Sequence, residues 1–219
     1  MIYRNAIPPW NDLNLRKIVS IVKPCIVLVH IRAVASFANI CKYSDKIKKT
    51  PVHEFNCHPF SHNEFIFCHN GIIEAFYDGT LRKKIINRIS DELITNIDGT
   101  TDSEYLFYLM MTFIYENNKD IIRGITNTIE FLNTITDDTE NMFCLNMCLI
   151  YGKEIYSMRY INIENDTPPS LYINGDSDEG SNEIVISSEP IDKNLPWRLI
   201  GKNKVVHIDS IGKIEEHTL

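Results

Sequence analysis

The sequence of 219 residues lacks any apolar run long enough to cross a membrane. Its longest apolar stretches, residues 25–31 and 106–115, fall short of the roughly 18–20 residues that a spanning helix needs. Pro8 and Pro9 interrupt the first segment before a signal-peptide core can form, so the expected location is the cytoplasm. No internal repeat is visible, and the length predicts one domain.

The sequence also lacks an excess of basic residues. With 22 Lys and Arg against 29 Asp and Glu, the formal net charge is -7 and the pI is about 5.5. Nucleic acids and anionic membranes are bound by basic faces, so neither is expected as a partner.

None of the six cysteines stands in a CxxC pair, which argues against a cysteine-based structural zinc site. The thiols of a cytoplasmic chain are expected to be reduced. Cys144 and Cys148 lie an even number of positions apart in a strand-like segment. We therefore expect both on one face of that strand, acting as small buried apolar side chains.

The apolar patterns predict strands, then helices, then a block of strands. Residues 25–33 are a β-branched run typical of a buried strand, and residues 34–55 indicate a long loop. Helical spacing covers residues 15–22, 81–97, 105–115 and 120–132, and strand-like segments follow from residue 141. Neighbouring strands are close in sequence, so the fold class is α+β with antiparallel sheet.

Two polar clusters near the predicted first strand have alternative interpretations. Arg32, in His30-Ile31-Arg32-Ala33, either ends a strand in solvent or grips a carboxylate through two parallel hydrogen bonds. The segment 56–60, with the sequence NCHPF, is typical of a turn.

Two further clusters follow. Asn70 and Gly71 form either a hairpin turn or an oxyanion hole, in which the Asn amide and the Gly backbone N–H meet a developing negative charge. Thr101–Glu104 fits the capping box S/T-x-x-E. Glu104 would then serve the cap and leave Asp102 free to bind an ammonium group. Together, an Arg, an Asn-Gly pair and an Asp complement the carboxylate, carbonyl and ammonium of a glutamyl group.

The ordered motifs HIRA, NCHPF, HNGII, GTTDSE and SSEP, the last followed by a Trp, resemble those of the class II glutamine amidotransferases. The likeness covers nearly the whole chain. Within this family, the sequence is most similar to the subgroup that includes the amidotransferase-like subunit of the fungal DUG glutathione-degrading complex.

This resemblance implies an N-terminal-nucleophile hydrolase fold, an αββα sandwich of two antiparallel sheets with flanking helices. It implies hydrolysis of γ-glutamyl amide bonds, with glutathione as the leading substrate and a possible peptidase-like partner subunit. Arg32 would hold the α-carboxylate, Asp102 the α-ammonium, and Asn70 with Gly71 the oxyanion. No metal or organic cofactor is implied, no catalytic role falls on His30, His58 or His69, and SSEP is expected to be architectural.

The family's nucleophile is a cysteine directly after the initiator Met, with its own α-amino group as the base. This chain begins Met1-Ile2-Tyr3. The expectation is therefore a glutamine amidotransferase type-2 domain over residues 1–219 that lacks its first strand or strands. The favoured explanation is a truncated sequence, inactive in this form. The alternative is a non-catalytic subunit that binds a γ-glutamyl ligand or serves as a scaffold.

Overall fold

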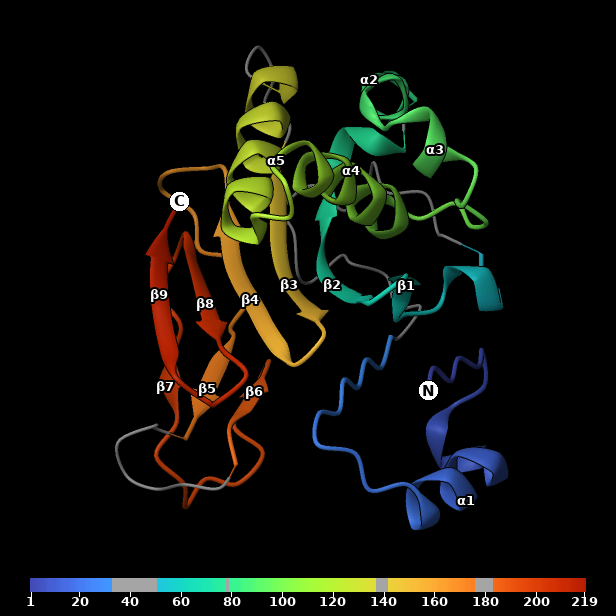
Figure 1. The fold of residues 1–219 in the computed structure, drawn as a ribbon, viewed down its shortest axis with the longest axis vertical. Helices are drawn as coiled ribbons and strands as arrows, with labels where there is room; N and C mark the ends of the chain where they lie inside the picture. Colours follow the sequence, from blue (N-terminus) through green and yellow to red (C-terminus); the bar gives the residue numbers. More distant parts are fainter. Residues whose placement is uncertain (33–50, 78, 137–141, 176–182) are drawn as a thin grey trace.

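The computed structural model describes residues 1–32, 51–77, 79–136, 142–175 and 183–219 (Figure 1). The α-helices are α1 (Leu13–Ile21), α2 (Thr80–Arg88), α3 (Asp91–Ile94), α4 (Asp102–Glu116) and α5 (Ile121–Thr136), and short 3-10 turns are η1 (Pro9–Asn11), η4 (Glu54–Asn56) and η5 (Glu74–Phe76). The strands are β1 (Phe60–His62), β2 (Phe65–Ile73), β3 (Phe143–Tyr151), β4 (Glu154–Ile161), β5 (Tyr172–Asn174), β6 (Val185–Ser187), β7 (Arg198–Leu199), β8 (Lys204–Ile208) and β9 (Ile214–Thr218).

The strands form two antiparallel sheets. The larger sheet has six strands in the order β1-β2-β3-β4-β8-β9, and the smaller has three in the order β6-β5-β7. Helices α4 and α5 lie across the larger sheet (Figure 1). The small sheet packs on the opposite face, where Ile173 and Ile200 meet Val206 and Ile208 of β8. The α+β class and the two antiparallel sheets are thus confirmed.

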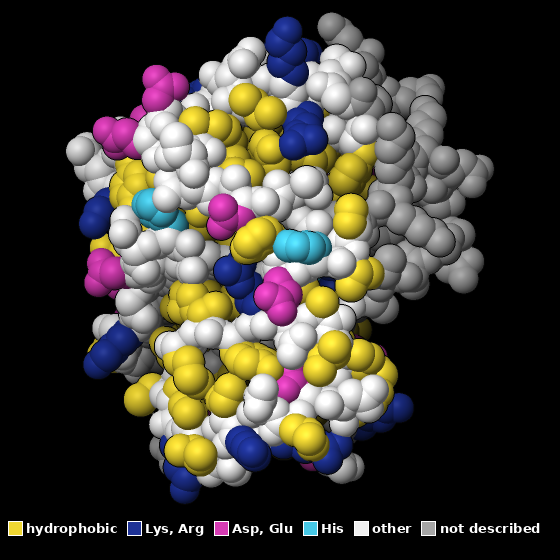
Figure 2. Space-filling view, turned by 90° about the vertical axis from the view of Figure 1, so that its right-hand side faces the viewer, with side chains coloured by type: hydrophobic (Ala, Val, Ile, Leu, Met, Phe, Trp, Pro, Cys, Tyr) yellow, Lys and Arg dark blue, Asp and Glu magenta, His cyan; other side chains and the backbone are white. Residues whose placement is uncertain are grey.

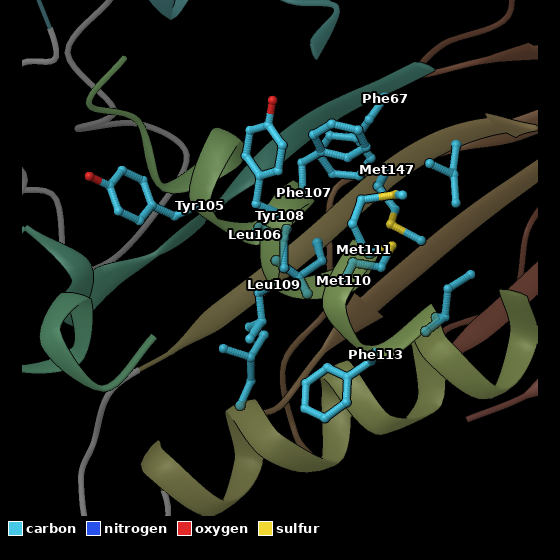
Figure 3. Close-up of a cluster of buried hydrophobic side chains, with 14 of the residues drawn as sticks. Phe67, Tyr105, Leu106, Phe107, Tyr108, Leu109, Met110, Met111, Phe113 and Met147 are labelled. Carbon is cyan, nitrogen blue, oxygen red and sulfur yellow. The ribbon is translucent and has the colours of Figure 1, made fainter. Parts of the chain in front are cut away.

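The main core lies between the larger sheet and helix α4. This helix is apolar nearly all round, and every residue from Asp102 to Ile114 is buried. Figure 3 shows Phe67 of β2 and Met147 of β3 beside Phe107 and Met111 of α4. The rings of Phe67 and Phe107 stack with centroids 5.3 Å apart. A helix enclosed in this way is held rigidly, which matters because its first turn carries Asp102.

The first 32 residues depart from expectation. Residues 25–32 form no strand in the structure, so the prediction of a buried strand at residues 25–33 is wrong for its described part. The side chains alternate between half-buried and exposed as in a strand, with Val27 and Val29 65% and 72% exposed. The pattern misleads here because a β-branched run specifies extended backbone but not a pairing partner.

The first 32 residues carry most of the large apolar side chains that are exposed among the described residues. These include Trp10, Leu13, Val19 and Ile21 on and around α1. Figure 2 shows apolar side chains gathered over the lower half of the face that it presents. Asp12 caps helix α1, because it accepts hydrogen bonds from the backbone N–H groups of Asn14 and Leu15, each at 3.0 Å.

Several element boundaries also differ from the sequence interpretation. The helix expected at residues 81–97 is two helices, α2 and α3, separated near Ile89 and Ser90. Helix α5 extends to Thr136, beyond the expected end. Most of the loop expected at residues 34–55 lies outside the described residues. In the part of the chain that is described, no helix has the length and apolar character needed to cross a membrane.

Gly124 provides a test of the helix packing. A Cβ atom at this position of α5 would lie 2.4 Å from Ile114 Cγ1 and 2.8 Å from Ile114 Cα in α4. We expect Gly124→Ala to lower the free energy of unfolding by about 1–3 kcal/mol, since overpacking against backbone outweighs the roughly 1 kcal/mol gain in helix propensity. Chemical denaturation measures this. The control Glu130→Ala, at an exposed position of α5, should change stability by under about 0.5 kcal/mol; a stabilised Gly124→Ala protein would contradict the packing.

Candidate functional site

Asn70 and Gly71 lie inside strand β2. The register of β2 with β3 continues without a break from Phe65 to Ile73, with Asn70 opposite Asn146 and Gly71 opposite Leu145. The hairpin-turn alternative for this pair is therefore wrong. Asn70 is exposed, and the residues on either side of this pair, His69 and Ile72, are buried. The amide of Asn70 is thus presented on a surface by a strand that is otherwise in the core.

Only a residue without a side chain fits at position 71. A Cβ atom there would lie 2.0 Å from the backbone oxygen of Cys144 and 2.5 Å from Nε2 of His69. Any side chain would push β2 away from β3, because one of the clashing atoms belongs to the backbone. The glycine therefore lets the backbone next to Asn70 stay in close contact with both neighbours.

Asp102 is the first residue of α4 and is only 4% exposed. Its Oδ2 accepts a hydrogen bond from the backbone N–H of Ile73 at 3.0 Å, and its Oδ1 accepts from the Tyr77 hydroxyl at 3.0 Å. The backbone N–H of Ser103 also donates to Oδ1, at 2.9 Å. The expectation that Asp102 would be left free is wrong. These bonds aim the carboxylate at the end of β2, two residues beyond Gly71, and use most of its acceptor positions.

A second link between α4 and β2 runs through His69. Its Nδ1 lies 3.0 Å from Ser103 Oγ, and its Nε2 lies 3.3 Å from the backbone oxygen of Cys144. Burial lowers the pKa of His69, although the nearby Asp102 carboxylate acts in the opposite direction. A neutral His69 then joins α4, β2 and β3, and it fixes Asp102 relative to Asn70 and Gly71.

Asn56 connects two of the sequence motifs. It is buried in the NCHPF segment, and its Oδ1 accepts a hydrogen bond from the backbone N–H of Thr100 at 2.8 Å. Glu104 accepts from the backbone N–H groups of Asp98 and Gly99, at 3.0 and 2.7 Å, so it supports the loop before α4. The Thr101 hydroxyl accepts from the Glu104 N–H at 3.2 Å, which confirms Thr101 as the N-cap. A Cβ at Gly99 would lie 2.6 Å from Asn56 Oδ1.

Arg32 is half-buried and lies among histidines. The rings of His30 and His58 have centroids 4.1 Å apart, and His58 meets the edge of Phe60 at 4.8 Å. Burial lowers the pKa of His30 to about 4, and the charges of His69 and Arg32 act in the same direction. Burial likewise lowers the pKa of His58, followed by the charges of His30, His69 and Arg32. The charge of Arg32 therefore acts on both rings.

Sequence reasoning gave His30 and His58 no role, and it missed a polar row beside Asn70. Asn146 and Arg159 are register partners next to Asn70 in the sheet. The buried Arg159 guanidinium donates to the backbone oxygens of Pro168, Pro169 and Ile200 at 2.8–3.0 Å, and Asn146 also donates to Pro169 O at 2.8 Å. The only signal in the sequence was an Arg and an Asn in otherwise apolar strands, which predicts buried polar contacts.

Three of the described cysteines, Cys57, Cys68 and Cys148, are poor candidates for a nucleophile. Burial raises the pKa of the Cys57 and Cys68 thiols, and it raises the pKa of Cys148 to about 11. A thiolate is the reactive form, so a raised pKa opposes catalysis. Cys68 and Cys148 are register partners on β2 and β3, and Cys144 is buried beside Ile72. The interpretation of Cys144 and Cys148 as apolar packing residues fits this placement.

The SSEP motif lies at the small sheet. Ser187 ends β6, and the backbone oxygen of Ser188 accepts a hydrogen bond from the Ser170 hydroxyl at 2.7 Å. Ser170 also follows Pro169, to which Asn146 and Arg159 are bonded. These contacts connect the small sheet to the polar row that ends at Asn70.

Known proteins resemble this chain in sequence and in fold. No family model matches the sequence. A curated Saccharomyces cerevisiae protein named "Probable glutamine amidotransferase DUG3" is 24% identical over 241 residues, a match that takes in 94% of this chain and 63% of that protein. This chain therefore spans less than two thirds of the curated relative's length.

Two solved structures share the fold. A glutamine aminotransferase class-II domain protein from Silicibacter pomeroyi superposes with a TM-score of 0.72 at 23% identity, covering 99% of this chain and 84% of that one. The allosteric regulatory enzyme of purine biosynthesis gives a TM-score of 0.52 at 15% identity, covering 76% of this chain and 32% of that one.

The paired antiparallel sheets with helices across one of them define the class of the fold, which is that of the N-terminal-nucleophile hydrolases. In sequence, the chain is similar over 94% of its length to the yeast protein that carries the name of a probable glutamine amidotransferase.

The lowered pKa of the half-buried His30 predicts that stability depends on pH. The unfolded chain takes up a proton at His30 near pH 6.5, whereas the folded chain does so only near pH 4. The unfolded state therefore binds more protons between these values, and stability falls as the pH drops through this window, by roughly 3 kcal/mol in full.

The comparison of His30→Gln with the wild type isolates this effect from the titration of carboxylates. The destabilisation caused by His30→Gln should be smaller at pH 5 than at pH 7, as measured by urea denaturation at both values. His53→Gln, at an exposed position, serves as the control. An equal effect of His30→Gln at both pH values would show that the His30 ring is not buried in the folded chain.

Proposed function

We propose that the chain forms the substrate-binding body of a γ-glutamyl amide hydrolase, as a type-2 glutamine amidotransferase domain over residues 1–219. The observation that carries the proposal is the double link between α4 and β2. Asp102 bonds to Ile73 N, and Ser103 bonds to His69, on either side of Asn70 and Gly71. The Asp102 carboxylate and the Asn70-Gly71 pair, the proposed oxyanion hole, are therefore held together at one end of β2.

The chemistry of a γ-glutamyl group fits these residues. The exposed Asn70 amide can donate to the scissile carbonyl oxygen, where negative charge grows in a tetrahedral intermediate. The Asp102 carboxylate, buried where the effective dielectric is low, attracts an α-ammonium more strongly than a surface acid does. The Arg32 guanidinium can bind the α-carboxylate with two hydrogen bonds. The backbone N–H of Gly71 completes the proposed oxyanion hole.

Glutathione is the proposed substrate, because the curated relative carries the DUG3 name and the sequence motifs resemble that subgroup. A peptidase-like partner subunit in the cytoplasm, which would process the remaining dipeptide, belongs to the same proposal. The chain's own acidic character gives no support for nucleic acid or an anionic membrane as a partner.

A second function, binding without catalysis, is favoured by one observation. The thiols of Cys57, Cys68 and Cys148 all have raised pKa values, so these three described residues offer no activated nucleophile. A chain of these 219 residues would then bind the γ-glutamyl group and leave it intact. The two candidate functions share the binding site and differ only in turnover.

Ligand binding tests the site. Calorimetric titration should show that the chain binds glutathione and glutamate, and that Arg32→Ala weakens both by about 100-fold, because two charge-assisted hydrogen bonds are lost. The control Arg123→Ala removes an exposed guanidinium from α5 and should leave the affinity unchanged. Equal affinities of the wild type and Arg32→Ala would remove the assignment of Arg32.

Asp102→Asn tests the ammonium site while preserving the shape of the side chain. We expect at least about a 10-fold loss of glutathione affinity, and a much smaller loss for a γ-glutamyl analogue that lacks the α-amine. Release of glutamate from glutathione, followed by an enzymatic glutamate assay, separates the two functions. Binding of glutathione without release of glutamate supports the binding subunit, and release of glutamate supports the hydrolase. A chain that binds neither glutathione nor glutamate would overturn both candidate functions.

A further inference from the structure

Three side chains of types that bind metal ions lie together on the hairpin formed by β8 and β9. This hairpin is separated along the sheet from the Asn70-Gly71 site on β2. One ligand atom from each of His207, Glu215 and His217 lies within 4.8 Å of the other two. Strands β3 and β4 stand between this hairpin and β2, which carries Asn70. The cluster is thus separate from the groups assigned to the γ-glutamyl ligand.

The sheet register explains why these three residues meet. His207 of β8 is the direct partner of Glu215 of β9, and His217 lies two positions further along β9. Residues two apart on a strand share a face, and direct partners in an antiparallel pair point to the same side. The three side chains therefore converge because of backbone pairing, and no long loop has to be ordered to form the cluster.

Neighbouring groups fix His207 further. Its ring stacks on Tyr156 with centroids 4.4 Å apart and an interplanar angle of 5°. Its Nε2 lies 2.8 Å from Glu154 Oε2, and the Tyr156 hydroxyl donates to the same oxygen at 2.6 Å. A carboxylate that accepts from one ring nitrogen is the usual companion of a metal-bound histidine, because it sets the orientation of the ring.

His217 adds an independent observation. Its Nε2 atom is buried and makes no hydrogen bond within the described part of the chain. A buried polar nitrogen without a partner costs free energy, and a bound cation would remove that cost if this nitrogen became a ligand. The side chain of His217 is thus poorly satisfied in the metal-free arrangement.

We propose that His207, Glu215 and His217 bind a zinc ion, with Glu154 orienting His207. Imidazole nitrogens with one carboxylate suit Zn²⁺, whereas Mg²⁺ and Ca²⁺ prefer oxygen ligands. Zinc bonds of about 2.0–2.2 Å require the ligand atoms to draw together to roughly 3.3 Å, a side-chain adjustment within one hairpin. The ion would hold β9, the edge strand of the larger sheet, to β8.

Lys213 competes with a metal ion for the Glu215 carboxylate. Its ammonium lies 2.6 Å from Glu215 Oε1, and this exposed ion pair has to open before Glu215 can turn fully toward a metal. Removal of the lysine charge should therefore tighten zinc binding.

Cobalt binding gives the sharpest test, because the chain also carries six cysteines. Co²⁺ titrated into the untagged, reduced chain should show visible d–d absorption of a one-to-one complex without the strong near-ultraviolet band of thiolate ligation, and Zn²⁺ should displace it. Glu215→Gln and His217→Ala should each weaken binding by at least about 100-fold, since loss of an orienting group alone costs about 10- to 100-fold. The control His62→Ala removes a histidine from β1 and should have no effect.

Lys213→Ala keeps the proposal testable even if a ligand variant folds poorly. We expect about a two- to fivefold gain in Co²⁺ and Zn²⁺ affinity, the amount that an exposed ion pair contributes. The matched control Lys153→Ala, in the exposed turn between β3 and β4, should leave the affinity unchanged. A thiolate band, or full binding by His217→Ala with its fold intact by circular dichroism, would overturn the proposal.

Discussion

The contact between the first turn of α4 and the end of β2 is the constraint on which the site depends. Asp102 is buried at the N-terminus of a helix, where the helix dipole favours negative charge. Its oxygens are satisfied by Ile73, Tyr77 and Ser103. Because α4 is enclosed by core side chains along its length, the helix cannot shift without disrupting the packing against β2 and β3. The packing of the core around α4 therefore fixes the position of the Asp102 carboxylate.

The motif residues divide into those that build this contact and those that face a ligand. Asn56, Gly99 and Glu104 shape the loop that leads into α4, and their own polar groups bond to backbone. His69 and Gly71 bring β2 close to its neighbours. In the proposed function, Asn70, Arg32 and the Asp102 carboxylate face the ligand, and Asp102 also bonds to backbone, so a short motif contains both structural and proposed binding residues.

The sequence was sufficient for the fold class, because strand and helix periodicities are local properties. It also identified the N-cap at Thr101 by its spacing, and it predicted a glutamyl-binding set from charge complementarity, which stays a prediction. It could not show that Asn70-Gly71 continues a strand, since an Asn-Gly pair specifies a turn unless a partner strand overrides it. Nor could it bring His207 to Glu215 and His217, because that meeting follows from strand register, which a single sequence specifies weakly.

The segment before Arg32 has a thermodynamic consequence of its own. Residues 25–32 are extended without strand pairing, and the contacts of the first 32 residues with the body include the tilted His30–His58 ring pair and the Cys57 thiol, which donates to Asn5 O at 3.7 Å. A ligand that needs Arg32 binds only to the docked population, so its apparent affinity is the intrinsic value scaled by that fraction. By reciprocity, ligand binding strengthens docking by the same factor, and protonation of His30 opposes both. For the proposed ligand, acid conditions would then lower the apparent affinity without altering any ligand contact.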